Sequence, residues 1–307
     1  MIMTRGQTPK QLVPGLNKIL GGSYGEVVNE HLPLFEIENS VRAFEEEVLL
    51  SSLGTAPTKN EGEGVQFDEM QELWTARYTM ETVALAYGIT EEAVEDNLYD
   101  TFTKIRTKAL GRAMATTKQI KAANVFNLGF SATRPGGDGV ALFSASHPTL
   151  SAGNQGNIEA SDISETALES AIIAINLIKD DRGVLIGATP VSLHIPPHLK
   201  FATHRILKST LSTTLGGATP FTNVNDTNAM RDMGLFQKGV YVNHRFADTD
   251  AWFIKTSVPN GTKMFVRKKL EAATEGDFDT GNMRFKARER YTFGFSDWRA
   301  WRGSSGA

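Results

Sequence analysis

The chain has 307 residues, 40% of them apolar and 22% charged, which suits one large domain or two closely joined ones and excludes wholesale disorder. A formal net charge of −3 excludes a global basic field for nucleic acid, and the lack of cysteine excludes disulfides, thiolate zinc sites and cysteine nucleophiles. The N-terminus has no apolar core of a signal peptide, and the longest apolar run, AIIAINLI at 171–178, is too short to span a bilayer. We therefore predict no membrane partner.

Residues 1–40 are expected to form an N-terminal arm. The segment is rich in glycine, and its apolar residues, such as Leu16, Leu20 and Leu34, follow no sustained period. This pattern favours an extended arm that lies on another part of the assembly.

Residues 41–88 predict a long β-hairpin. Two strand-like runs flank GTAPTKNEGEG, which contains turn residues from Gly54 to Gly64, and the second run alternates apolar and polar side chains from Trp74 to Met80. A lone hairpin is marginal in water, and nothing else in the chain obviously covers its apolar side chains, so we expect a neighbouring subunit to cover them. The predicted inter-subunit residues are Val48, Leu50, Leu53, Lys59, Phe67 and Trp74.

Residues 90–130 predict one long helix, capped by Thr90 and weakened in the middle by Gly111. At 1.5 Å per residue it would reach on the order of 50–60 Å, which is long enough to act as a spine for other elements. Its apolar stripe is expected to comprise Val94, Leu98, Phe102, Ile105, Ala109, Ala113, Ile120 and Ala123.

A mixed α/β block follows. A second helix is expected over about 163–180, with Asp162 and Glu165 as a capping box and Gly183 as its stop. A strand over 189–195, a short helix after Pro197 and several short strands come next. The expected buried face of the second helix is Leu168, Ala171, Ile172, Ile175 and Ile178.

The last strand, NMRFKARERYTFGFSDW, alternates cleanly between an apolar face and a basic face. With no internal repeats and no βαβ alternation, the chain is assigned to the α+β class. The apolar face is Met283, Phe285, Ala287, Tyr291, Phe293 and Phe295, and the other face is Arg284, Lys286, Arg288, Arg290 and Thr292.

The stretch FSASHP raises the question of catalysis, because Ser144 and Ser146 stand next to His147. Members of a catalytic triad meet through the fold and not as sequence neighbours, and no G-x-S-x-G elbow is present. His194 and His198 have zinc-helix spacing, but prolines between them forbid a helix. We predict a structural loop, no active site and no cofactor or metal, with a serine hydrolase as the less favoured alternative.

Two basic stripes, RKK at 267–269 and the Arg/Lys row at 284–290, allow two interpretations. They are favoured as solvated strand faces, or as faces paired with acidic residues of a neighbour. The alternative is phosphate contact without sequence preference.

RAMATTKQIKAANVFNLGFS at 112–131, followed by GDGVALFSASHP at 137–148, resembles the major capsid proteins of tailed bacteriophages, in particular the Mu-like major head subunit group. The resemblance continues through DDRG, IPPHLKFATHRILKST, DTDAWFIKT and KARERYTFGFSDWRAWRGSSGA, in the same order over nearly the whole chain.

The resemblance implies the tailed-phage capsid fold, with residues 1–40 as N-terminal arm, 41–88 as extended loop, 89–160 as peripheral domain with the spine helix, 161–260 as axial domain and 261–307 as return strands of the peripheral domain. It implies self-assembly into pentamers and hexamers of an icosahedral shell around double-stranded DNA, which is contacted without sequence preference. The implied location is the virion, after assembly in the host cytoplasm, with scaffold, portal and decoration proteins as further partners. Because only 40 residues precede the loop, no long fused scaffolding segment is expected. An encapsulin-like cellular compartment is the alternative.

Overall fold

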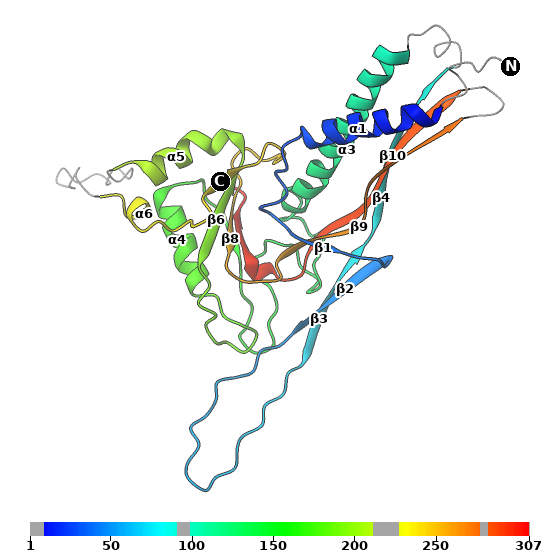
Figure 1. Cartoon of the computed structure of the whole chain (residues 1–307). Coiled ribbons are helices and arrows are strands. Elements are labelled where there is room, and N and C mark those ends of the chain that lie inside the picture. Colours follow the sequence, from blue (N-terminus) through cyan, green and yellow to red (C-terminus); the bar gives the residue numbers. More distant parts are fainter. Residues whose placement is uncertain (1–8, 91–98, 211–226, 277–281, 307) are drawn as a thin grey trace, which may run out of the picture.

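The computed structural model describes residues 9–90, 99–210, 227–276 and 282–306. Figure 1 shows an elongated limb, a rounded body that holds the C-terminus, and a long arm that projects away from both. The limb is built on a four-stranded sheet and the body on a five-stranded sheet, while two further strands form the arm. This mixed architecture confirms the α+β class.

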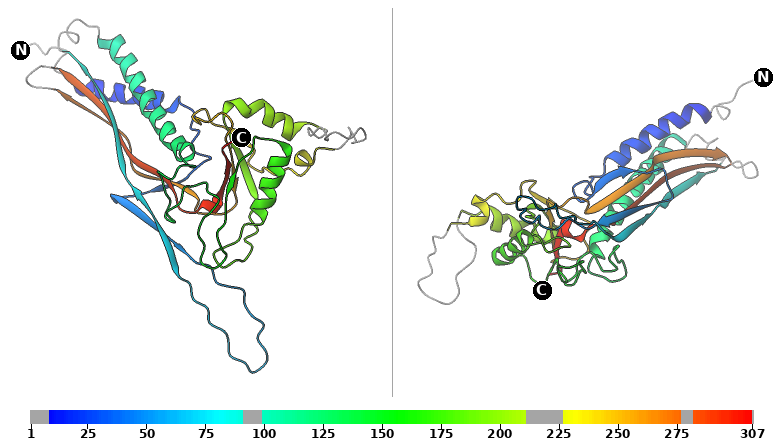
Figure 2. Two further views of the ribbon diagram at one scale, coloured as in Figure 1. Left: turned by 180° about the vertical axis from the view of Figure 1, so that it is seen from behind. Right: turned by 90° about the horizontal axis from the view of Figure 1, so that it is seen from below.

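The limb is a twisted sheet with helices on one side (Figure 2). β1 pairs parallel with β9, and β10 pairs antiparallel with both β9 and β4. On β10 the predicted alternation is confirmed as far as Tyr291, because Phe285, Ala287 and Tyr291 are buried while Arg284 and Arg288 are exposed. Beyond Tyr291 it is wrong, because Thr292 of the predicted basic face is buried whereas Phe293 and Phe295 are only half-buried. The strands are β1 (Glu36–Asn39), β4 (Glu81–Ile89), β9 (Thr262–Gly276) and β10 (Met283–Phe295), and the main helix is α3 (Tyr99–Asn127).

The N-terminal segment is a helix over much of its length, which corrects the prediction of an extended arm. α1 (Pro9–Gly25) crosses α3, and Leu16 and Leu20, four residues apart, pack against Leu110 and Met114. A Cβ atom at Gly111 would lie 2.8 Å from the Leu20 carbonyl oxygen. The glycine predicted as a weak point is therefore the place where the two helices touch.

The buried face of α3 differs from the predicted stripe. Val94 and Leu98 lie outside the described residues, and so does the first helical turn that Thr90 was predicted to cap. Ile105 and Ile120 of the predicted stripe are 59% and 43% exposed. Polar side chains occupy the inner face because they find partners there: the hydroxyl of Thr107 donates to the Thr103 carbonyl at 2.8 Å and meets the Tyr87 hydroxyl at 2.6 Å. Of the other predicted stripe residues Ala109 is exposed, Ala113 is half-buried and Ala123 is buried.

The body contains α4 (Glu165–Asn176), whose predicted apolar face is confirmed as buried. Its cap is Ser164, which accepts a hydrogen bond from the Ala167 amide, and not the predicted Asp162. The helix ends before Gly183, which instead adopts a positive φ of 87° in a later turn. The remaining elements are β5 (Ile158–Glu159), β6 (Pro190–Ile195), η2 (Pro197–Leu199), α5 (Lys200–Lys208), α6 (Ala229–Asp232), β7 (Val240–Val242), β8 (Trp252–Thr256), η3 (Trp298–Ala300) and β11 (Trp301–Ser304).

Residues 261–307, which are predicted as return strands of a peripheral domain, divide between the two sheets. β11 pairs with β8 and β5, so residues 301–304 belong to the sheet of the body. The chain crosses between the two sheets at η3, immediately after β10.

Limb and body share one aromatic core centred on Phe126 of α3, which has no exposed surface. Its ring lies 5.9 Å from Phe35, 5.4 Å from Phe253 and 4.7 Å from Trp301, so the N-terminal segment, the spine helix and the body sheet meet at one side chain. Within the described residues, no helix is long and apolar enough to cross a membrane.

Candidate functional site: the arm

The arm is a hairpin of β2 (Phe44–Leu50) and β3 (Glu72–Thr79), paired antiparallel from Phe44↔Thr79 to Leu50↔Glu72. It is shorter than the predicted span of 41–88. The Met80 amide closes the ladder on the Ala43 carbonyl at 3.1 Å, and the chain then enters β4, whose partner is β10 of the limb. The second predicted run is therefore two strands in two different sheets.

The root of the arm is fixed to the limb. Tyr78 packs edge-on against Phe265 at 4.9 Å, and its hydroxyl meets the Ser296 hydroxyl at 2.5 Å. Burial raises the pKa of Tyr78, so this phenol stays protonated. Glu47 of β2 contacts both Lys263 and Ser296. Ala76, Tyr78 and Met80 are thus covered by their own chain, which corrects the expectation that only a neighbour could cover them.

The middle of the arm is braced against the body. The Ser51 amide donates to the Gln71 carbonyl, and the Gln71 amide donates to the Ser51 hydroxyl, both at 2.8 Å. The Gly54 amide donates to Asp68 at 2.8 Å. Asp68 also accepts from Arg182 of the DDRG turn at 3.0 Å. The amides of Gly54 and Glu69, together with Arg182, hold the pKa of the Asp68 carboxyl below its usual value.

Beyond this brace the tip, residues 55–67, has no strand pairing. Asn60 donates to Glu63 from its amide and its side chain, at 3.3 and 3.1 Å, which shapes the turn. The exposed fractions of the apolar side chains along the arm are 45% for Val48, 52% for Leu50, 54% for Leu53, 68% for Val65, 93% for Phe67 and 55% for Met70. Apolar side chains in a protein core have much smaller exposed fractions, so these residues form an apolar surface that another molecule can cover.

The six predicted inter-subunit residues fall in different places. Val48, Leu50, Leu53, Lys59 and Phe67 are exposed along the arm, whereas Trp74, between the partners of Val48 and Leu50, is half-buried. Val65 and Met70, which the prediction omitted from the set, are exposed in the same way. The sequence could have indicated Val65 and Met70 as well, because apolar residues beside a glycine-rich turn have no partner in the hairpin itself.

The FSASHP loop lacks the geometry of a serine hydrolase. His147 is fully buried, its Nδ1 lies 2.6 Å from Asp138, and its Nε2 lies 3.1 Å from the Asn157 side-chain oxygen. Both ring nitrogens are therefore occupied, and neither faces Ser144 or Ser146. The ring stacks on Trp298 at 4.4 Å, which gives the loop a structural role between limb and body.

Asn157, which sequence analysis missed, joins several segments. Its side-chain oxygen accepts from the Ser144 amide at 2.9 Å as well as facing His147, and its side-chain nitrogen faces the carbonyls of Leu142, Trp298 and Trp301 at 2.8, 3.2 and 3.1 Å. We call His147, Asn157 and their partners the Asn157 junction. A single asparagine in a glycine-rich loop carries no sequence signal for such a role.

The basic stripes are partly neutralised within the chain. Glu271 of the same chain lies 3.2 Å from Arg288 and 3.2 Å from Lys268, so these two basic residues find an acidic partner without a neighbour. On the opposite face of β10, Glu289 is buried beside Lys118 of α3 at 2.6 Å. Within the described residues, no cluster of three or more histidine or acidic side chains has a metal-binding arrangement.

Comparisons with known proteins agree with this arrangement. Residues 72–302 match the family described as phage capsid protein. The fold is similar to the capsid of a native GTA particle (TM-score 0.56, 12% identity, 92% of this chain and 91% of that one) and to a virus-like particle from Pyrococcus furiosus (TM-score 0.55, 10% identity, 95% and 98%). It is also similar to the capsid of Myoviridae phage XM1 (TM-score 0.51, 10% identity, 89% and 90%). No curated protein matches the sequence. Because the family match covers most of its length, the chain belongs to the phage capsid protein family.

Proposed function

We propose that this capsid protein builds a closed icosahedral shell by laying its arm across a neighbouring copy. The observation that carries the proposal is the exposure of Leu53, Val65 and Phe67 on the outer part of the hairpin, beyond its covered root. Burying one such side chain contributes about 1.5–3 kcal/mol, so several together can favour association. The protein then acts through assembly and not through catalysis.

The contact has to be heterologous, because the arm of one copy meets a different surface of the next. Such contacts close into rings, which fits the pentamers and hexamers of an icosahedral shell. We assign the limb to the peripheral domain and the body, β11 included, to the axial domain around each ring axis.

The contents and partners of the shell are part of the same proposal. We infer that it encloses double-stranded DNA, assembles in the host cytoplasm, and has scaffold, portal and decoration proteins as candidate partners. An encapsulin-like compartment is the second candidate, favoured only by the fold likeness to the virus-like particle. Purified particles that protect double-stranded DNA from nuclease support the phage shell, whereas particles that hold a protein cargo support the compartment.

Shortening the arm tests the proposal. Replacing residues 56–66 by Asn-Gly keeps the bond between Gly54 and Asp68 but removes the reach of the tip. We expect a folded subunit with a near-native circular dichroism spectrum that sediments as monomers or capsomers, without closed shells in electron micrographs. A control that replaces Thr55–Pro57 by Gly-Ser-Gly keeps the length and all predicted inter-subunit residues, and it should still assemble. Closed shells of normal size from the shortened chain would overturn the proposed function.

A further inference from the structure

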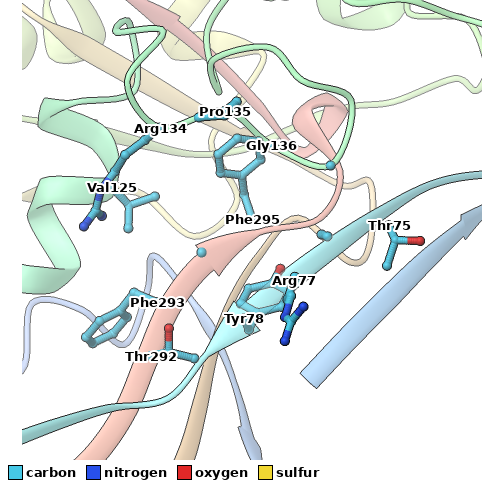
Figure 3. A pocket seen from close by; sticks show the side chains of 13 residues that line it. Thr75, Arg77, Tyr78, Val125, Arg134, Pro135, Gly136, Thr292, Phe293 and Phe295 are labelled. Carbon is cyan, nitrogen blue, oxygen red and sulfur yellow. The ribbon is translucent and has the colours of Figure 1, made fainter. Parts of the chain in front are cut away.

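A pocket of about 550 Å³ lies in the body, between α5, α6 and the edge strand β7. It is larger than the cavity of about 360 Å³ at the root of the arm, which Figure 3 shows with Thr75, Arg77 and Arg134 in its lining. In Figure 1, α5 and α6 lie at the end of the body that is remote from the limb, and no lining residue of the body pocket belongs to the arm. Its volume is in the range of sites that bind small molecules.

The walls of the body pocket are fixed by the start of α6 and the turn after it. The buried Asn228 donates from its side chain to the Ile206 carbonyl and, at 3.1 Å, to the Ser209 hydroxyl, so α6 begins against the end of α5. Gly234 and Gly239 have positive φ values of 58° and 78°, which favour glycine, and a Cβ atom at either would meet no other atom within 4 Å. The pocket is therefore part of the fold of the single chain.

Most of the lining is apolar. It comes from α5, from α6 and the turn after it, and from the two strands at the edge of the sheet. Phe201 of α5 also belongs to it and is 75% exposed, so the apolar surface continues from the pocket to solvent. Such a lining favours an aliphatic part of a ligand. The other large apolar residues in it are Ile195, Leu207, Met230, Phe236, Val240 and Val242.

Positive charge borders this apolar lining. Lys200, His204 and Lys208 follow one another at four-residue steps along α5, so they share one face of the helix, and Arg231 of α6 adds a fourth basic group. All four are exposed, and the lining contains no aspartate or glutamate. No described residue forms an ion pair with any of them. The border of the pocket therefore favours an anion.

A buried hydroxyl is the second indication of a ligand. Thr203 is 1% exposed and lines the pocket on the same face of α5 as Lys200 and His204. Its Oγ1 has no hydrogen-bond partner among the described residues. Buried hydroxyls in folded proteins nearly always have a partner, because an unpaired one costs free energy. A carboxylate oxygen in the pocket could accept from this group.

We propose that the body pocket binds a fatty-acid anion. The acyl chain lies along the apolar lining, and the carboxylate lies at the α5 border, where Thr203 and the basic residues can donate to it. The pocket belongs to the folded body, so the ligand should stabilise the subunit by mass action. This function is separate from the assembly contact of the arm.

Binding of dodecanoate to the full chain tests the proposal. Below its micelle concentration, titration calorimetry should give a single site per chain, and saturating ligand should raise the melting temperature. Decanoate should bind about tenfold more weakly, because two methylene groups fewer are buried. Dodecanol and dodecylammonium have the same chain without the negative charge, so they should bind at least about tenfold more weakly.

Variants of α5 locate the site. Lys200→Glu with Lys208→Glu should weaken dodecanoate binding by about tenfold or more, and leave dodecanol within about twofold, because only the charged head meets the changed residues. Arg205→Glu is the matched control, since Arg205 is exposed on the same helix but outside the lining, and it should leave dodecanoate within about twofold. Thr203→Val should weaken binding without lowering the melting temperature, because it removes an unpaired buried hydroxyl. Circular dichroism checks that each variant folds.

Three results would overturn the proposal. Equal affinity for dodecanoate and dodecanol, or an equal loss in Arg205→Glu, would mean that the anion meets apolar surface without the basic border. Binding that appears only after deletion of residues 213–224, which lie outside the described part of the chain, would assign the pocket to the chain's own segment. Binding to soluble subunits that disappears in closed shells would assign it to contact between copies.

Discussion

At the tip of the arm Val65 and Phe67 keep 68% and 93% of their surface exposed, whereas in the Asn157 junction the polar side chains of His147 and Asn157 are completely buried. The tip exposes apolar groups that have no partner in their own chain. The junction buries polar groups that have partners in the segment before Asn157 and in η3 and β11. We therefore expect changes at the junction to affect folding of the single subunit, and changes at the tip to affect the assembly.

The largest loss of folding stability is expected for Asn157→Ala. The change removes a completely buried side chain that contacts the Ser144 amide, the His147 ring and three backbone carbonyls. The ring keeps Asp138 and the Trp298 carbonyl keeps the Trp301 amide, but the other groups lose the partner that Asn157 gives them. Several unsatisfied buried groups together should lower the free energy of unfolding by about 3–5 kcal/mol, measured by urea denaturation.

The control for this change is Asn154→Ala in the same loop. Asn154 is exposed, and its side chain donates to Ser146 at 2.7 Å. Its loss should stay within about 0.5 kcal/mol. Equal losses for the two asparagines would show that the junction does not join limb and body.

Two phenylalanines, one in the limb and one at the tip of the arm, allow the same comparison with an effect of intermediate size on stability. Phe293 is partly buried and lies 4.9 Å from the Phe35 ring and 5.4 Å from the Tyr291 ring, so Phe293→Ala should destabilise the subunit by about 2–3 kcal/mol. Phe67→Ala should change subunit stability by less than about 0.5 kcal/mol but sharply reduce shell formation. Thermal melting and electron microscopy of both variants measure the difference. A large loss of melting temperature for Phe67→Ala would mean that its own chain covers the ring.

Sequence periodicity predicted the elements whose burial is decided by one simple pattern. The alternation of β10 as far as Tyr291 and the apolar face of α4 were both correct, because each element packs one side on a single layer. The stripe of α3 was wrong because this helix contacts α1 on one part of its surface and the sheet on another, and threonines with local partners are buried as readily as isoleucines. α1 was missed because its glycines masked the helical spacing of Leu16 and Leu20.

The arm could be located from sequence, but its length and anchoring could not. The apolar alternation from Trp74 to Met80 changes phase before Val83, and the tertiary fold shows that the chain changes sheets at this point. The bonds of Asn157 likewise join residues up to 144 positions apart.

A smaller effect is expected for the serine next to His147. Ser146 is exposed and accepts one hydrogen bond, from Asn154. Ser146→Ala should therefore cost no more than about 1 kcal/mol and leave shell formation unchanged. Ester or peptide hydrolysis that disappears in this variant would restore the hydrolase alternative.

The smallest effect on folding, and the most informative about the arm, is expected at its brace. Arg182→Ala removes the contact between the DDRG turn and Asp68 but leaves the bond from Gly54 to Asp68 in place. Because Asp68 lies at the surface, the melting temperature should barely change, while amide hydrogen exchange across residues 51–71 should become faster.

Acid should act in the same direction as Arg182→Ala. The pKa of Asp68 is lowered in the folded chain, first by the Gly54 amide, so the brace is complete above the ordinary carboxyl pKa of 3.8 and is lost as the pH falls below it. Arg77→Ala is the control, since Arg77 pairs with Glu46 across the hairpin and not with the body. If Arg182→Ala left exchange at the arm unchanged, or if Arg77→Ala accelerated it equally, the direction of the arm would be set at its root alone and not by the body.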